Sequence, residues 1–258
     1  MPNTGEIITH LERFAPISLA DEDDNVGLLL GTREREVKKI MVSLNADSAA
    51  VDEAIEKGVD MLICHHPLIF LPIRGIAADD FVGRNLLRLA EAKIALYAMH
   101  TNLDWADGGV NDCLCEALCL SNVRALVMGP NGAKVARIGN VPALSLSTMV
   151  ERVRGAINPA AKYVGKPDKI INTVAVCGGG GGSLLDDVLK NHCDLYISSD
   201  FRYHEAQKAH EEGVALIDAG HFETENIIIK PLANYVKMVY NSIDVFSAEC
   251  SGKYWVYE

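Results

Sequence analysis

Hydrophobic and polar positions along the chain alternate in the manner of an α/β protein. Short apolar runs bounded by Gly, Pro or polar residues predict buried strands, and the longer amphipathic segments between them predict helices. The predicted strands cover residues 26–30, 40–44, 59–64, 94–99, 173–177, 195–198, 214–218, 243–248 and 254–257. The predicted helices cover residues 7–14, 48–57, 81–92, 111–119, 145–157, 184–191, 203–212 and a long segment from about 223. Such alternation favours parallel strands joined by crossover helices.

The middle of the chain, residues 122–167, is less regular. A turn at Gly129-Pro130-Asn131-Gly132 lies among short predicted strands, and Pro231 predicts a kink in the last helix. We therefore expect an α/β fold of two interlocked lobes with mixed, largely parallel sheets. One lobe comprises roughly residues 1–125 plus C-terminal elements, and the other comprises residues 126–258.

Two adjacent histidines, His65 and His66, close the apolar run 59–64, and Pro67 ends that strand. In open α/β sheets the carboxyl ends of strands are where ligand crevices form. Because side chains alternate along a strand, the two imidazoles can serve two neighbouring metal ions, or one ion and the groups behind its ligands. The alternative is a hydrogen-bonded pair in a turn.

Two further predicted strands end in a histidine that is followed four residues later by a carboxylate. These pairs are His100 with Asp104 and His221 with Glu225. A spacing of four places both side chains on one face of a helix. Imidazole nitrogen and carboxylate oxygen together suit zinc, manganese, iron or nickel better than calcium. The sequence therefore predicts a metal site in the cleft between the two lobes.

Weaker signals lie near these strand ends. Asp200 and His204 repeat the four-residue spacing, which makes them candidates for contacts behind the ligands or with substrate, unless Asp200 only caps a helix. The five glycines at 178–182 can cradle an anion or form a tight turn with positive φ. The acidic run at 21–24 is interpreted as a solvated loop.

Composition narrows the classes of partner. The net charge is −11, with 49% hydrophobic and 6% aromatic residues, which argues against nucleic acid as the main partner. An anionic small molecule remains compatible, because two bound divalent cations would reverse the local potential. No apolar run reaches membrane-spanning length, and the first residues do not resemble a signal peptide. The seven cysteines lack framework spacing, so we expect reduced thiols and a cytoplasmic protein without membrane partners.

Several motifs occur in the order seen in a known family. The chain resembles the GTP cyclohydrolase 1 type 2 homologue family, also called Nif-three-like, in its short form without an inserted domain. The motifs are Asp24-Asn25-Val26-Gly27-Leu28, His65-His66-Pro67-Leu68-Ile69-Phe70, His100-Thr101-Asn102-Leu103-Asp104, Gly108-Gly109-Val110-Asn111-Asp112, the 178–182 glycines, and Asp218-Ala219-Gly220-His221 with Glu225. Asp23 stands where many members have tryptophan, and Asn45 stands where an aspartate is common.

This resemblance implies a two-lobed fold with a dinuclear metal site and a ring-shaped homohexamer. His66 and Asp104 would hold one divalent ion, His65 and His221 the other, and Glu225 would bridge them.

We accordingly expect a metal-dependent hydrolase of a small phosphorylated or nucleotide-like substrate. The two ions would be zinc, iron, manganese or nickel, and His100 or His204 would transfer a proton. His100 is also placed by the resemblance near the metals, behind the ligands or as a further ligand. The alternative is a non-catalytic metal-binding protein that acts in regulation or metal trafficking through partner proteins.

Overall fold

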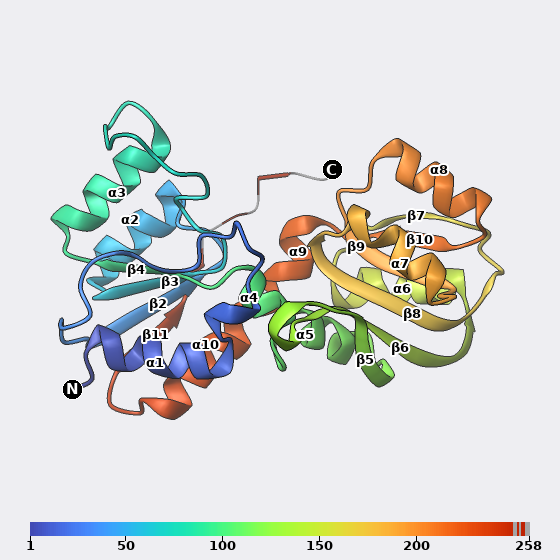
Figure 1. Ribbon diagram of the computed structural model, residues 1–258, viewed down its shortest axis with the longest axis horizontal. Helices are drawn as coiled ribbons and strands as arrows, with labels where there is room; N and C mark the ends of the chain where they lie inside the picture. Colours follow the sequence, from blue (N-terminus) through green and yellow to red (C-terminus); the bar gives the residue numbers. More distant parts are fainter. Residues whose placement is uncertain (250–251, 253, 256–258) are drawn as a thin grey trace. The chain divides into compact units, whose positions relative to one another are not determined.

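The computed structural model describes residues 1–249, 252, 254 and 255. The chain divides into two compact units, each built on its own sheet (Figure 1). The first unit combines residues 1–103 with the described residues from Ile228 on, and the second is Asp104–Ile227. Both sheets are mixed and carry helices, so the predicted α/β class is confirmed.

The first unit contains a five-stranded sheet in the order β1-β4-β3-β2-β11. Strands β4, β3, β2 and β11 are parallel, whereas β1 pairs with β4 in the antiparallel sense. The central strands are apolar and almost fully buried, as expected for parallel strands covered on both faces. The strand bounds are β1 Gly27–Leu30, β2 Lys39–Ser43, β3 Met61–Cys64, β4 Ala95–Ala98 and β11 Asp244–Ser247.

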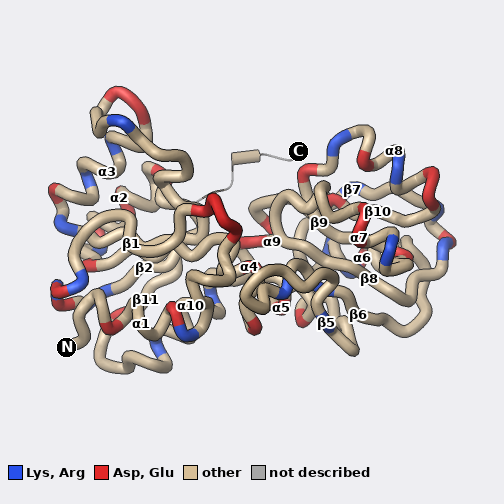
Figure 2. The backbone as a smooth tube through the Cα atoms, viewed as in Figure 1, with Lys and Arg blue, Asp and Glu red and all other residues tan. Residues whose placement is uncertain are grey.

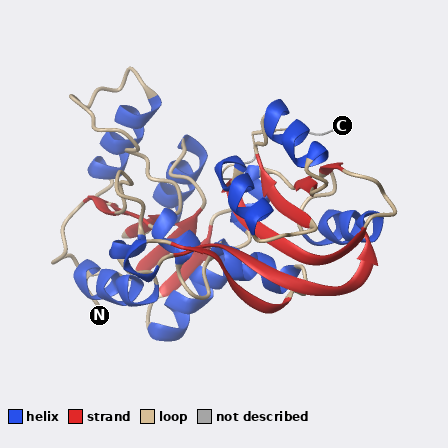
Figure 3. Cartoon of the chain, turned by 45° about the vertical axis from the view of Figure 1, so that its right-hand side comes forward, coloured by secondary structure: helices blue, strands red, loops and turns tan. Residues whose placement is uncertain are grey.

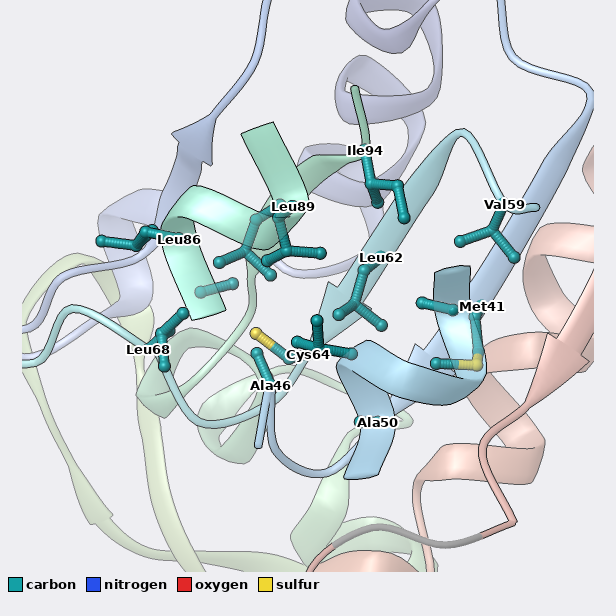
Figure 4. Packing of buried hydrophobic residues seen from close by; sticks show 14 residues of the cluster. Met41, Ala46, Ala50, Val59, Leu62, Cys64, Leu68, Leu86, Leu89 and Ile94 are labelled. Carbon is teal, nitrogen blue, oxygen red and sulfur yellow. The ribbon is translucent and has the colours of Figure 1, made fainter. Parts of the chain in front are cut away.

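Helices cover both faces of this sheet. In Figure 1, α2 (Ser48–Lys57) and α3 (Phe81–Glu91) lie on one face, and α1 (Thr4–Phe14) and α10 (Ile229–Val239) lie on the other. A buried cluster beneath α2 and α3 includes Leu62 of β3 and Leu89 of α3 (Figure 4). A 3-10 turn spans Ile17–Leu19.

The second unit contains a six-stranded sheet in the order β5-β6-β8-β9-β10-β7. Strands β8, β9 and β10 are parallel, and the other three pairings are antiparallel. Strands β5, β6 and β8 are longer than any strand of the first unit (Figure 3). The strand bounds are β5 Ser121–Met128, β6 Lys134–Ser145, β7 Lys162–Val164, β8 Ile170–Gly180, β9 Leu195–Ser199 and β10 Ala215–Asp218.

Short helices connect these strands. Helices α5 and α9 pack against β8, and α8 packs against β10 and β7. Helix α4 (Thr101–Trp105) contains the point at which the chain passes from the first unit to the second. The remaining bounds are α5 Val110–Ala117, α6 Leu146–Ala156, α7 Leu185–Lys190, α8 Tyr203–Glu211 and α9 His221–Asn226, with 3-10 turns at Pro130–Gly132 and Gly182–Leu184.

The predicted long helix from residue 223 is in fact two helices. Helix α9 ends at Asn226 and α10 begins at Ile229. Pro231 lies in the first turn of α10, where its missing N–H leaves no helical hydrogen bond unmade. The predicted kink at Pro231 is therefore wrong, because the break comes before the proline.

The middle of the chain is also more regular than predicted. The turn at Pro130–Gly132 is confirmed, but it joins two long antiparallel strands, β5 and β6, rather than short segments. At the C-terminus, Tyr254 and Trp255 lie in no strand, and the rest of the strand predicted at 254–257 falls outside the described residues.

Charged side chains are interspersed over each unit. In Figure 2, Lys and Arg positions alternate with Asp and Glu positions along the backbone of each unit. Within the described part of the chain, every helix is too short or too polar to cross a membrane.

Candidate metal centre

Three histidines gather at the carboxyl edge of the first sheet. His65 and His66 follow β3 directly, and His100 follows β4, its parallel neighbour. The ring centroids lie 5.0, 5.2 and 5.6 Å apart, and one nitrogen of each ring lies within 4.8 Å of the others. We call His65, His66 and His100 the histidine cluster. Parallel strands place their carboxyl ends together, which is why residues far apart in sequence meet here.

His65 is the most deeply buried of the three, with 1% of its surface exposed. Its Nδ1 donates to the main-chain oxygen of Met99 over 2.8 Å. A carbonyl oxygen only accepts, so Nδ1 carries the proton and the lone pair of the neutral ring lies on Nε2.

His66 is oriented by a residue at the end of the adjacent strand. Its Nδ1 donates to Asn45 Oδ1 over 2.7 Å, and Asn45 follows β2. The main-chain oxygen of Asn45 accepts a hydrogen bond of 2.6 Å from Ser43 Oγ. The neutral amide of Asn45 therefore orients the His66 ring.

His100 is oriented by Asp24, which lies in the acidic run predicted to be a solvated loop. His100 Nδ1 donates to Asp24 Oδ1 over 2.8 Å, and Asp24 Oδ2 accepts from the Thr101 amide over 3.0 Å. Burial raises the pKa of Asp24, but the hydrogen bonds from His100 and Thr101 outweigh it and bring the pKa to about 2. The interpretation of Asp24 as solvated is wrong, because its side chain is almost fully buried and ionised at neutral pH.

In the second unit, His221 and Glu225 lie one turn apart on α9. His221 Nε2 is 3.1 Å from Glu225 Oε2, and its Nδ1 is 2.6 Å from Asp200 Oδ2. The hydrogen bond to Glu225 is the largest cause that raises the pKa of His221 to about 9, against the opposing effect of burial. Asp200 therefore contacts His221 instead of capping α8, whose N-cap residue is Arg202.

The glycine run at the end of β8 lets Glu225 and His221 approach its backbone. A Cβ on Gly179 would lie 2.1 Å from Glu225 Oε1 and 3.3 Å from His221 Nε2, and φ there is +63°. The Gly179 amide donates to Thr224 Oγ1 over 3.0 Å, and the Gly178 amide donates to Asn111 Oδ1 over 2.9 Å. Because these two amides already donate to protein oxygen atoms, they are not available to bind an anion. The lack of a Cβ at Gly179 instead leaves space for the Glu225 side chain.

Asp104 lies on α4 and is buried. Its main-chain oxygen accepts a hydrogen bond of 2.9 Å from Asn111 Nδ2, and this same asparagine receives the Gly178 amide. Asn111 thus connects the end of α4 to the end of β8 within the second unit. Burial, with added repulsion from the charges of Asp104 and Glu225, raises the pKa of the nearby Cys177 thiol, which makes this cysteine unreactive.

His204 is not brought to any of these groups. It is exposed on α8, with its Nδ1 3.4 Å from Gln207 Oε1. Among the residues that the structure describes, His204 belongs to no set of side chains spaced to hold a metal ion. Its predicted proton-transfer role remains a prediction without geometric support.

The sequence indicated Asp200 as a candidate for a contact behind the ligands, but it did not identify Asp24, Asn45 or the Met99 carbonyl as hydrogen-bond partners of the histidines. Asp24 lies in one of the motifs that resemble the family, and this motif could have pointed to Asp24 as the partner of His100. The Met99 carbonyl carries no sequence signal, because any residue supplies one.

The donor set fits a divalent transition-metal ion. All four histidines at these strand ends direct Nδ1 to an oxygen atom: Met99 O, Asn45 Oδ1, Asp24 Oδ1 and Asp200 Oδ2. This arrangement is the usual one for metal-ligating histidines, since it fixes the orientation and the tautomer of the ring. The second unit adds the buried carboxylates of Asp104 and Glu225, and imidazole nitrogen and carboxylate oxygen are donor types suited to zinc, iron, manganese or nickel.

Comparisons with known proteins identify relatives over most of the chain. The GTP cyclohydrolase 1 type 2 homolog of Clostridium acetobutylicum is 36% identical over 220 residues, which cover 83% of this chain and 82% of that protein. NIF3-like protein 1 of Drosophila melanogaster is 32% identical over 227 residues, covering 85% and 76%.

Solved structures share the fold. A Bacillus cereus protein related to NIF3 matches with a TM-score of 0.94 at 23% identity, covering 100% of this chain and 99% of that one. Reduced HcgD from Methanocaldococcus jannaschii matches with a TM-score of 0.84 at 30% identity, covering 96% and 98%. The model of the Duf34/NIF3 (NGG1p interacting factor 3) family matches residues 2–251. The chain therefore belongs to the Duf34/NIF3 family.

Proposed function

We propose that this protein binds two divalent metal ions and hydrolyses a small phosphorylated or nucleotide-like molecule. The observation that carries the proposal is the shared orientation of the four histidines, each with Nδ1 bonded to an oxygen atom. Metal-ligating histidines almost always donate the N–H of their other ring nitrogen to an oxygen atom, and these four rings share that arrangement. Family membership supports the same conclusion.

The proposed ligands are five residues. Following the family resemblance, His66 and Asp104 hold one ion, His65 and His221 hold the other, and Glu225 is shared between them. The ions would supply Lewis-acid activation and a water of lowered pKa.

His100 is the proposed proton carrier. Its Nδ1 is bonded to the ionised Asp24, so a proton taken up at Nε2 would give an imidazolium stabilised by a carboxylate 2.8 Å away. The same pairing of imidazole and carboxylate orients the general base in hydrolytic triads. Asp24 is thus a positioning residue for His100.

Metal content is the first test. Protein purified without added metal is analysed for its elements, and we expect about two equivalents of divalent transition metal. Glu225→Gln keeps the shape of the side chain but removes a ligand charge, and we expect metal affinity to fall at least about tenfold. Glu223→Gln, on the same helix, is the matched control. Less than one equivalent in the wild type, with no uptake on reconstitution, would refute the metal assignment.

Turnover is the second test. Metal-loaded protein is screened against phosphoesters, cyclic nucleotides and GTP, and we expect hydrolysis that Glu225→Gln abolishes and Glu223→Gln retains. Hydrolysis that survives Glu225→Gln would come from another site. Stoichiometric metal binding without turnover of any of these compounds would favour the regulatory or metal-trafficking alternative.

A further inference from the structure

A pocket of about 540 Å³ opens beside His66 in the first unit. Its walls come mainly from the segment that follows His66, through Phe70, Leu71 and Ile73, and from Phe81 at the start of α3. The volume lies in the range of sites for small organic ligands. No step of the proposed hydrolysis uses this pocket.

The described lining of the pocket is poor in charge. Among the residues that the structure describes, no Lys or Arg lines it, and its one carboxylate is Asp47. Both Asp47 oxygens are engaged within the protein: Oδ1 accepts from the Ala50 amide over 2.8 Å, and Oδ2 accepts from the Tyr254 hydroxyl over 2.6 Å. The described lining residues supply no Lys or Arg as a counter-charge for a phosphate group, and burying an unpaired phosphate among them would be costly.

The walls are largely apolar, and apart from the Asp47–Tyr254 pair the described polar lining side chains are His66 and Asn45. Phe70, Phe81 and Tyr254 contribute aromatic rings, and Leu71 contributes an aliphatic side chain that is 71% exposed. Large apolar side chains left this exposed around a concave surface are typical of ligand sites.

The floor of the pocket belongs to the hydrophobic core. Ala46 and Leu68, labelled in Figure 4, line the pocket and also belong to the buried cluster beneath α2 and α3. The polar end is formed by His66 and Asn45, which are bonded to each other over 2.7 Å. A ligand that fills the pocket would therefore rest on a packed floor and reach a candidate metal ligand at one end.

We propose that this pocket binds an uncharged, flat heteroaromatic ring and so places the groups attached to that ring beside His66. Aromatic walls favour a planar ring through edge and face contacts, and ring nitrogens or exocyclic groups can use the polar end. That the bound ring belongs to the substrate depends on the proposed function. It narrows the substrate to molecules with a nucleobase-like ring, whose phosphates would lie outside the pocket.

The test uses quinoline, a neutral bicyclic probe at pH 7.5, titrated into the full-length protein and followed by NMR. Leu71→Asn and Phe81→Ala remove apolar contacts from the walls, and we expect each to weaken quinoline binding about fivefold. Met238→Asn is the matched control, because Met238 is 78% exposed on α10 of the same unit and does not line the pocket. Inorganic phosphate should not compete with quinoline, and cyclohexanol should bind more weakly.

Several results would overturn the inference. Equal quinoline affinity in the wild type, Leu71→Asn and Phe81→Ala would exclude the pocket as the binding site. Competition by inorganic phosphate would show an anion site instead. A change of oligomeric state in Leu71→Asn without a change in quinoline affinity would identify the surface as an interface between copies of this chain.

Metal analysis separates this inference from the proposed function. If Glu225→Gln and the wild type both lack metal but bind quinoline equally, the ring pocket stands and the metal assignment fails. If the wild type holds metal, and Phe81→Ala retains the metal but no longer binds quinoline, the metal assignment and the ring pocket are both supported. If metal is held and quinoline does not bind the wild type, only the ring pocket fails.

Discussion

Replacing Gly179 by alanine tests whether the absence of a side chain at this position allows Glu225 to pack against the backbone of β8. The added Cβ would lie 2.1 Å from Glu225 Oε1, far inside contact distance, and φ at this position is +63°. Two separate costs follow. An alanine in the left-handed region costs about 1–2 kcal/mol, and the buried Glu225 carboxylate must also move away from its present position.

The second cost can be estimated from what Glu225 contacts. Its Oε2 lies 3.1 Å from His221 Nε2, and a hydrogen bond to a charged group contributes about 1.5–3 kcal/mol. Because the His221 side chain is 42% exposed, we take the lower part of that range. The free energy of unfolding should therefore fall by about 2.5–4 kcal/mol in Gly179→Ala.

Gly213→Ala provides the matched control. Gly213 lies in the same unit with φ of +74°, but a Cβ there would meet nothing within 4 Å. In Gly213→Ala the free energy of unfolding should fall only by the backbone cost of about 1–2 kcal/mol, and the metal content should not change. Both variants are compared by urea denaturation of metal-free protein and by elemental analysis. Equal destabilisation of the two, with metal content preserved in Gly179→Ala, would refute the role assigned to Gly179.

Three further predictions concern pH, packing and assembly. In metal-free protein the pKa of His221 is raised from 6.5 to about 9, so its pairing with Glu225 stabilises fully below pH 6.5 and is lost as the pH rises through 9. The urea midpoint should therefore fall as the pH is raised from 6.5 to 9. If the midpoint of Glu225→Gln fell with pH as steeply as that of the wild type, the pairing would be contradicted. Leu89→Ala, at a fully buried position of α3, should cost about 2–5 kcal/mol, whereas Leu87→Ala, 37% exposed on the same helix, should cost less than about 1 kcal/mol. Similar urea midpoints for these two variants would contradict the packing in Figure 4. The family resemblance predicts a homohexamer, and a monomer at micromolar concentration in light scattering after size exclusion would exclude the ring.

Hydrophobic periodicity was sufficient to locate most elements, because each strand core is a short apolar run and each helix has one apolar face. The strand before His65 ended at Cys64 as predicted, and the strand before His100 ended at Ala98, one residue before its predicted end. It failed where tertiary pairing extends a strand, as in the β5–β6 hairpin, and where two helices follow each other closely, as at Asn226 and Ile229.

The sequence by itself determined the kinds of atom available at the strand ends. Histidine and carboxylate residues follow apolar runs at His65, His100 and His221, and within one sheet parallel strands bring their carboxyl ends to one edge. Only the tertiary structure decided which nitrogen of each ring is bonded and to what. Hydrogen bonds from His100 to Asp24 and from His221 to Asp200 join residues 76 and 21 positions apart, and their geometry depends on the packing of separate loops. A sequence pattern encodes local periodicity, whereas the orientation of a side chain is fixed by partners that meet only after the chain has folded.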